Sequence, residues 1–300
     1  MKTMVRRSGS GRSAIRLRAR GGRRVSRSRW GNVVLLLVLT LFGVFMALPL
    51  VYTIVTAFKP AHEIFVFPPR FFVRDPTVEN FIAVYQLTAE MYVPLSRYIF
   101  NSLLVAAGGT AVYVFVASFA AYPLAKYRFK WIGVYTTVVV WAILFRGEVT
   151  SIPQYIIISE LHMVNTYFAV ILPALGSSFG VFLMIQFMSA FPDSVLEAAY
   201  IDGAGEFRVL WSVVMPSVKP AWLTLIIFTF QNFWNATGIQ FLYDERLKML
   251  PTVLSQISGG GMARAGASAA VAMILMIPPI VLFLLSQSSV IETMSHAGIK

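Results

Sequence analysis

The sequence predicts an all-α integral membrane protein with six transmembrane helices, and three observations support this fold class. Hydrophobic residues occupy 57% of the 300 positions and charged residues only 13%, whereas a soluble domain carries about 25% charged residues. The apolar residues stand in long uninterrupted runs that would expose apolar surface in water. The basic residues gather in alternate loops between these runs, as they do in membrane proteins. Most of the chain therefore has lipid as its solvent.

Six apolar segments are expected to cross the membrane as helices, which need about 20 residues to pass through the hydrocarbon. Their ranges are 32–58, 98–122, 131–145, 167–191, 221–243 and 265–289. The third is short, so it must continue past Arg146 and Glu148 or end near them. Pro49 predicts a bend in the first segment, Gly108-Gly109 a close helix contact in the second, and Pro278-Pro279 an interruption of the sixth.

Residues 1–29 form a separate basic arm with 11 Lys or Arg and no acidic residue. Such an arm can bind nucleic acid or anionic lipid, or hold the chain end on the cytoplasmic side. It stands directly before an apolar run with Trp30 at the join, which favours a positive-inside anchor with membrane-lipid contact and no nucleic acid. That run is too long for a signal-peptide core of about 7–15 residues. The membrane domain is therefore expected to cover residues 30–300.

The distribution of basic residues predicts the orientation. Six crossings place both termini on one side, and a cytoplasmic assignment gives that side 17 of the 25 Lys and Arg. The short loop after the second segment is clearest, because it holds Lys126, Arg128 and Lys130 and no acid. Both termini are therefore predicted to be cytoplasmic.

Several function classes are disfavoured by what the sequence lacks. Without cysteine there is no disulfide, thiolate metal site or cysteine nucleophile, and the three histidines lie far apart. The chain has no G-x-x-x-x-G-K-[ST] phosphate loop, so neither a cofactor nor ATP hydrolysis is expected in it. No histidine or paired carboxylate stands in an apolar segment, which disfavours an intramembrane enzyme. An ion-coupled secondary transporter is a second alternative, although five of the six segments carry no charge.

The loop between the fourth and fifth segments is the most informative part of the chain. Residues 192–206 hold four acidic residues on a side where basic residues dominate. Pro192 and Asp193 predict a helix start, and Gly203 predicts a turn that residues with a side chain resist. Apolar residues then recur at helical spacing at Phe207, Leu210, Trp211 and Val214, before Met215-Pro216. Two short helices folded at a glycine on the membrane surface are expected, and they could merely connect two spans.

The same loop carries a motif. It resembles the EAA loop of ABC-importer permeases, which reads E-A-A-x3-G-x9-I-x-L-P. In this chain the pattern is Glu197-Ala198-Ala199, three residues, Gly203, nine residues, Val213, one residue and Met215-Pro216. The chain departs from this pattern only by Val for Ile and Met for Leu. The resemblance covers roughly residues 30–300 and includes Leu161–Thr166, where His162 replaces a family glycine. It also includes Phe233-Trp234-Asn235 and the ending Gly298-Ile299-Lys300.

The resemblance implies the fold of a type I ABC importer permease and the function of a maltose-transporter-like carbohydrate permease subunit in the inner or plasma membrane of a prokaryote. Residues 192–220 would be the loop that docks on a cytoplasmic ABC ATPase dimer, which would bind ATP and Mg. The coupling residues would be Glu197, Ala198, Ala199, Asp202, Gly203 and Pro216. A second homologous permease is implied, as is an extracytoplasmic solute-binding protein that meets the loop from Lys59 to Arg97. A permease for amino acids or peptides is the alternative within this family.

Polar residues in the fifth segment are candidates for the substrate path, because polar groups inside a span tend to face a cavity or another helix. Gln231, Asn232 and Asn235 can share one helix face, and Trp234 offers a flat surface for a sugar ring. Hydrogen bonds between helices would explain the amides equally well. Secondary candidates are Asn101, Ser102, Ser177 and Ser178.

Overall fold

The computed structural model describes residues 29–144 and 147–297, and within these ranges all regular secondary structure is helical. The predicted all-α class is confirmed. Most of the basic arm lies outside the described residues. The contacts divide the chain into two compact units, Met1–Pro49 and Leu50–Lys300, so each unit is described by itself.

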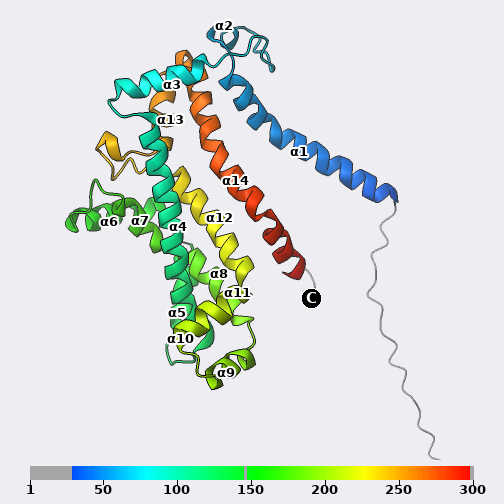
Figure 1. The fold of residues 1–300 in the computed structure, drawn as a ribbon, viewed down its shortest axis with the longest axis vertical. Coiled ribbons are helices and arrows are strands. Elements are labelled where there is room, and N and C mark those ends of the chain that lie inside the picture. Colours follow the sequence, from blue (N-terminus) through cyan, green and yellow to red (C-terminus); the bar gives the residue numbers. More distant parts are fainter. Residues whose placement is uncertain (1–28, 145–146, 298–300) are drawn as a thin grey trace, which may run out of the picture. The chain divides into compact units, whose positions relative to one another are not determined.

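The elements follow one another in a simple order (Figure 1). The helices before the EAA loop are α1 Arg29–Ala57, α2 Ala61–Ile64, α3 Glu79–Glu90, α4 Leu95–Lys126, α5 Ile132–Ala142, α6 Gly147–Glu160, α7 Phe168–Leu175 and α8 Ser178–Ser189. The EAA loop contains α9 Asp193–Ile201, α10 Glu206–Val209, the π-helical turn η1 Leu210–Val214 and α11 Met215–Ser217. The remaining elements are α12 Lys219–Asn235, the 3₁₀ turn η2 Glu245–Leu247, α13 Leu250–Ser258, the 3₁₀ turn η3 Gly261–Arg264 and α14 Ala265–Ala297.

Not every predicted span is a single straight helix. In the described part of the chain, three helical stretches are long and apolar enough to cross a membrane: 30–57, 95–126 and 261–287. Two further stretches are bent pairs, with an angle of 44° between α7 and α8 and of 84° between the α10–α11 stretch and α12. The third predicted segment contains the short apolar helix α5, and a new helix, α6, begins at Gly147.

The fifth segment ends earlier than the hydropathy predicts. Helix α12 stops at Asn235, and Ala236 is extended at φ −67° and ψ 127°. Gly238 then adopts a positive φ of 61°, a conformation that favours glycine. Phe241 and Leu242 are only 3% and 1% exposed, so they contribute apolar character as parts of a buried loop. The predicted end at Tyr243 was therefore wrong.

The predicted interruption of the sixth segment at Pro278-Pro279 was also wrong, because α14 continues through both prolines. A proline inside a helix leaves the carbonyl four residues earlier without its donor. For Pro279 that carbonyl belongs to Leu275, and it accepts a hydrogen bond of 2.8 Å from the indole N–H of Trp234 on α12. A neighbouring helix thus supplies the missing donor, as membrane helices allow.

Helix α4 is the central element of the second unit, and it packs along α12 and α8, while α12 also packs along α14 (Figure 1). Two clusters of buried apolar residues surround α4. The first joins its amino-terminal part to α12, α13 and α14. The second joins its carboxyl-terminal part to α8, to the start of α12 and to the EAA loop through Leu196, Val209 and Val214. The EAA loop is therefore packed into the helix bundle.

Gly109 permits the close approach of α4 and α12. A Cβ atom at this position would lie 2.8 Å from ring atoms of Phe233, and Phe233 is 3% exposed. The neighbouring Gly108 has no atom within 4 Å of such a Cβ. The close contact predicted for Gly108-Gly109 is thus confirmed for the second glycine.

We predict that Gly109→Ala lowers the apparent melting temperature of the purified chain relative to Gly108→Ala. Both substitutions gain helix propensity equally, but only the first forces Phe233 to move, at a cost of about 1–3 kcal/mol. Thermal unfolding of the two variants in the same detergent measures the difference. Equal melting temperatures would show that α4 and α12 are not in contact at Gly109.

Candidate functional site

The EAA loop begins as a helix that ends at a glycine. Pro192 is the N-cap and Asp193 the first residue of α9, as the sequence predicts. Gly203 has a φ of 79° and donates to the carbonyl of Tyr200 at 3.0 Å, while Ala204 donates to the carbonyl of Ala199 at 3.0 Å. These two bonds form a Schellman motif, which requires a left-handed residue after the C-cap. The predicted glycine turn is confirmed.

One face of α9 is buried and the other is free. Leu196 is 6% exposed and packs in the cluster with α4 and α8, with Ala199 partly buried beside it. Glu197, Ala198 and Asp202 are exposed. Ile201 is 86% exposed, an unusual state for an isoleucine in a folded protein. The loop therefore presents acidic and apolar side chains together on its outer face.

The start of the loop is attached to the carboxyl-terminal end of α4 by Lys126. Its ammonium group forms an ion pair of 2.7 Å with Asp193 and also donates to the carbonyl of Phe191. The Lys126 side chain is 4% exposed, so water does not screen this group fully. Hydrogen bonding to Lys126 holds the pKa of Asp193 below its usual range, and Asp193 is ionised at neutral pH.

The middle of the loop is attached to α4 by a cluster of two tyrosines and a carboxylate. The hydroxyls of Tyr122 on α4 and Tyr200 on α9 lie 3.0 Å apart. Tyr200 donates to Glu206 on α10 at 2.8 Å. Burial raises the pKa of Tyr200 to about 12, so this hydroxyl keeps its proton and acts as a donor. Together with Lys126, this cluster forms what we call the α4–loop junction.

Sequence reasoning missed the α4–loop junction. Lys126 was interpreted only as a charge that sets orientation, because its partners Phe191 and Asp193 are 65 and 67 residues away. Pro216, a predicted coupling residue, lies outside the junction, in the short helix α11. It follows the π-helical turn η1, and the chain then turns by 84° into α12.

A cavity of about 810 Å³ lies among the helices of the second unit. It is lined by residues of α4, α5, α6, α12 and the break between α7 and α8. Its polar side chains are Tyr113, Thr150, Gln154, Ser177, Ser178, Thr229 and Asn232. We call this space the polar cavity, and its size suits a small solute.

Tyr113 on α4 holds the break that opens this cavity. Its hydroxyl donates to the carbonyl of Ser177 at 2.7 Å and accepts from the N–H of Gly180 at 2.9 Å. A Cβ atom on Gly180 would lie 2.4 Å from that hydroxyl, so the small residue is needed here. The break between α7 and α8 is thus bonded directly to α4.

The structure separates the four predicted substrate-path residues. Asn232 lines the polar cavity, whereas Gln231 and Asn235 are not among its lining residues. Trp234 is 1% exposed, stacks on Phe230 with ring centroids 5.9 Å apart and donates to Leu275. Its ring is therefore covered by protein, and we correct its expected role from sugar stacking to helix packing.

The secondary candidates also divide into two groups. Ser177 and Ser178 line the polar cavity. Asn101 donates to the carbonyls of Arg246 and Lys248 at 2.8 and 2.9 Å, and Ser102 accepts from the N–H of Leu250 at 2.8 Å. These two residues hold the loop before α13 against α4. Thr150 and Gln154 were missed, because they lie in α6, after the predicted end of the third segment.

His162, which replaces a family glycine, has a φ of 56°. This left-handed conformation explains why glycine suits the position. Asn165 in the same segment has a φ of 63°, and its side-chain oxygen accepts from the N–H groups of Tyr243 and Asp244 at 3.1 and 2.9 Å. The segment is therefore fixed to the loop that follows α12.

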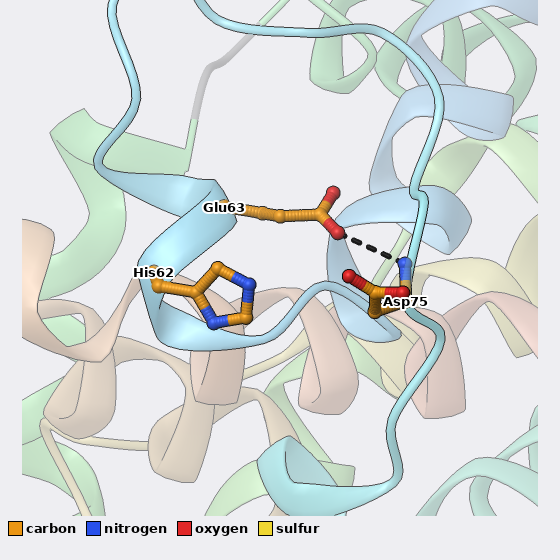
Figure 2. Close-up of side chains that lie close together, drawn as sticks. All are labelled: His62, Glu63 and Asp75. Atoms are coloured by element: carbon orange, nitrogen blue, oxygen red, sulfur yellow. Dashed lines mark hydrogen bonds between the residues drawn. The ribbon is translucent and has the colours of Figure 1, made fainter.

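His62, Glu63 and Asp75 form a group whose possible ligand atoms lie within 4.8 Å of one another, the one such group of three in the described ranges. Figure 2 shows the Glu63 carboxylate directed at the backbone nitrogen of Asp75, with which it forms a hydrogen bond of 2.9 Å. Glu63 also accepts from the N–H of Arg74 at 3.1 Å. The Asp75 bond holds the pKa of Glu63 below its usual range. We interpret Glu63 as a residue that fixes the loop after α2.

These features are those of a membrane protein with a polar cavity among its helices and a surface loop that packs on one side and is exposed on the other. No family model matches the chain, but curated relatives do. The probable ABC transporter permease protein YurM of Bacillus subtilis is 29% identical over 91% of each chain. The sn-glycerol-3-phosphate transport system permease protein UgpE of Yersinia enterocolitica is 31% identical over 65% of this chain and 70% of that protein. Protein LplC of Bacillus subtilis is 30% identical over 72% of each.

A solved structure agrees on the fold. A bacterial ABC transporter involved in the import of the acidic polysaccharide alginate contains a chain that matches with a TM-score of 0.73 and 19% identity, over 87% of this chain and 98% of that one. The relatives establish that this chain belongs to the ABC transporter permease family. The predicted resemblance of the chain to ABC-importer permeases is thereby confirmed.

Proposed function

We propose that the chain is the permease subunit of an ATP-driven importer of a carbohydrate, in the inner or plasma membrane of a prokaryote. The names of the relatives support the substrate class, since they include permeases for sn-glycerol-3-phosphate and for polygalacturonan and rhamnogalacturonan. The polar cavity supports it too, because amides and hydroxyls suit the hydroxyls of a sugar. An amino-acid or peptide permease is the alternative.

The proposed topology has six crossings with both termini in the cytoplasm. The crossings would be α1, α4, α5 with α6, the α7–α8 pair, α12 and α14. The EAA loop then lies in the cytoplasm, in agreement with the basic residues Lys126, Arg128 and Lys130 that stand beside it. The Lys59–Arg97 loop lies outside, where a solute-binding protein would meet it.

The single observation that carries the proposal concerns helix α9 of the EAA loop. One face of this helix is packed against the bundle, and the opposite face is exposed. Glu197, Ala198 and Ile201 offer charge, close approach and an apolar anchor to a partner. Buried apolar anchors of this kind dominate protein interfaces. The partner would be a cytoplasmic ATPase dimer, which would bind ATP and Mg and hydrolyse the ATP. A second homologous permease would complete the pathway.

Helix α4 would carry the motion of the loop to the polar cavity. Its Tyr122 and Lys126 hold the loop, and its Tyr113 holds the break between α7 and α8. Tyr113 and Tyr122 are nine residues apart, or about 13 Å along a helix. Closure of the ATPase dimer would therefore move the loop, α4 and one wall of the polar cavity together, a form of rigid-body gating.

Gly203→Pro is expected to abolish ATP-driven uptake while the chain still inserts in the membrane. Proline fixes φ near −65° and cannot adopt the 79° found here, and it removes the N–H that bonds Tyr200. Gly205→Pro is the matched control, because Gly205 has a φ of −74°. Uptake in membrane vesicles measures the effect. Normal uptake in Gly203→Pro, or equal loss in both variants, would argue against coupling through this turn.

Asn232→Ala is expected to raise the KM for sugar uptake about two- to tenfold, the value of one hydrogen bond. Asn235→Ala on the same helix is the control, since Asn235 is exposed and does not line the polar cavity. Concentration series of labelled sugars, with amino acids as a second panel, separate the two substrate classes. An unchanged KM in Asn232→Ala would show that the polar cavity is not part of the substrate path.

A further inference from the structure

A second large cavity, of about 910 Å³, lies between α4, the end of the EAA loop, α12 and α14. It shares no lining residue with the polar cavity. Its walls are almost entirely apolar, and among the described residues Lys219 is the one charged residue that lines it. We call this space the apolar groove.

The length of the apolar groove matches one leaflet of a bilayer. On α12 the lining residues run from Lys219 to Phe230 through Trp222 and Ile226. Eleven residues of helix rise about 16 Å, which is about half of the roughly 30 Å hydrocarbon thickness. Lys219 is the first residue of α12, so the charge stands at the end of the groove that adjoins the EAA loop.

That end of the groove also offers an ammonium group that an apolar occupant would leave without a partner. Lys219 is exposed, and the ion pairs of the described residues join Lys126 to Asp193 and Lys248 to Glu245, so neither uses Lys219.

We propose that the apolar groove binds an anionic phospholipid of the cytoplasmic leaflet. Its phosphate oxygens would accept from Lys219, and one acyl chain would lie along Ile226 and Phe230. Basic pockets between membrane helices on the cytoplasmic side favour anionic headgroups. The leaflet follows from the topology under Proposed function, whereas the binding does not depend on transport. The acyl chain provides no partner for the buried hydroxyl of Thr110, which also lines the groove.

This lipid would touch the EAA loop itself. Trp211, Met215 and Pro216 form one wall of the groove, and Trp211 stacks on Phe115 of α4 with ring centroids 5.6 Å apart. The bound lipid would therefore support the end of the EAA loop from the membrane side. Its loss should loosen that end without emptying the polar cavity.

Native mass spectrometry of the full-length chain, purified with the subunits that accompany it, tests the proposal. Phosphatidylglycerol and phosphatidylcholine of the same acyl chains are titrated separately. We expect Lys219→Gln to lower phosphatidylglycerol occupancy about fivefold, the contribution of one basic residue near an anionic surface, with phosphatidylcholine little changed. Lys130→Gln is the control, because Lys130 is exposed and lies outside the groove.

Two results would overturn the proposal. One is equal phosphatidylglycerol occupancy in the unmodified chain, Lys219→Gln and Lys130→Gln. The other is a protein occupant, detected when a cysteine in place of Ile226 crosslinks to a second permease subunit in the assembled transporter. Neither readout uses uptake, so failure here is distinguishable from failure of the transport function.

Discussion

The α4–loop junction is the contact on which the rest of the structure depends. Lys126 holds the start of the EAA loop through Asp193, and Tyr122 holds its middle through Tyr200 and Glu206. Ion pairs at an exposed surface contribute little, and the Asp193 side chain is 72% exposed. The Lys126 side chain is only 4% exposed and also donates to the carbonyl of Phe191, so the attachment does not rest on the ion pair alone. The same helix bonds the break beside the polar cavity. A loop that was merely a connection would not need two polar attachments to one span.

A second lesson concerns how polar atoms are satisfied inside the bundle. Pro279 leaves the carbonyl of Leu275 without a helical donor, and Trp234 supplies one from α12. One tryptophan thereby satisfies the carbonyl that the second proline of α14 frees, and this bond accompanies its own burial. Membrane helices tolerate a proline when a neighbouring group supplies the missing donor. The tryptophan at position 234 of α12 is therefore linked to the proline 45 positions later in α14.

The sequence predicted those parts of the fold whose signal is local. The apolar runs, the helix start at Pro192 and Asp193 and the turn at Gly203 depend on neighbouring residues, and the structure contains them. The end of α12, the continuity of α14 and the role of Trp234 depend on contacts between distant segments, and these predictions were wrong. The α4–loop junction was missed for the same reason. Of the amides on α12, Asn232 lines the polar cavity and Gln231 and Asn235 do not. The sequence could not distinguish them, because tertiary packing decides which side of a helix faces a cavity.

The most direct test of this account compares uptake with ATP hydrolysis in the assembled transporter carrying both Tyr122→Phe and Lys126→Met. These changes remove the polar attachments of α4 to the EAA loop and leave the exposed face of α9 intact. We expect ATP hydrolysis to persist while sugar moved per ATP falls severalfold, with Lys130→Met as the unaffected control. An unchanged ratio in the double variant would contradict the claim that α4 carries the motion of the loop to the polar cavity.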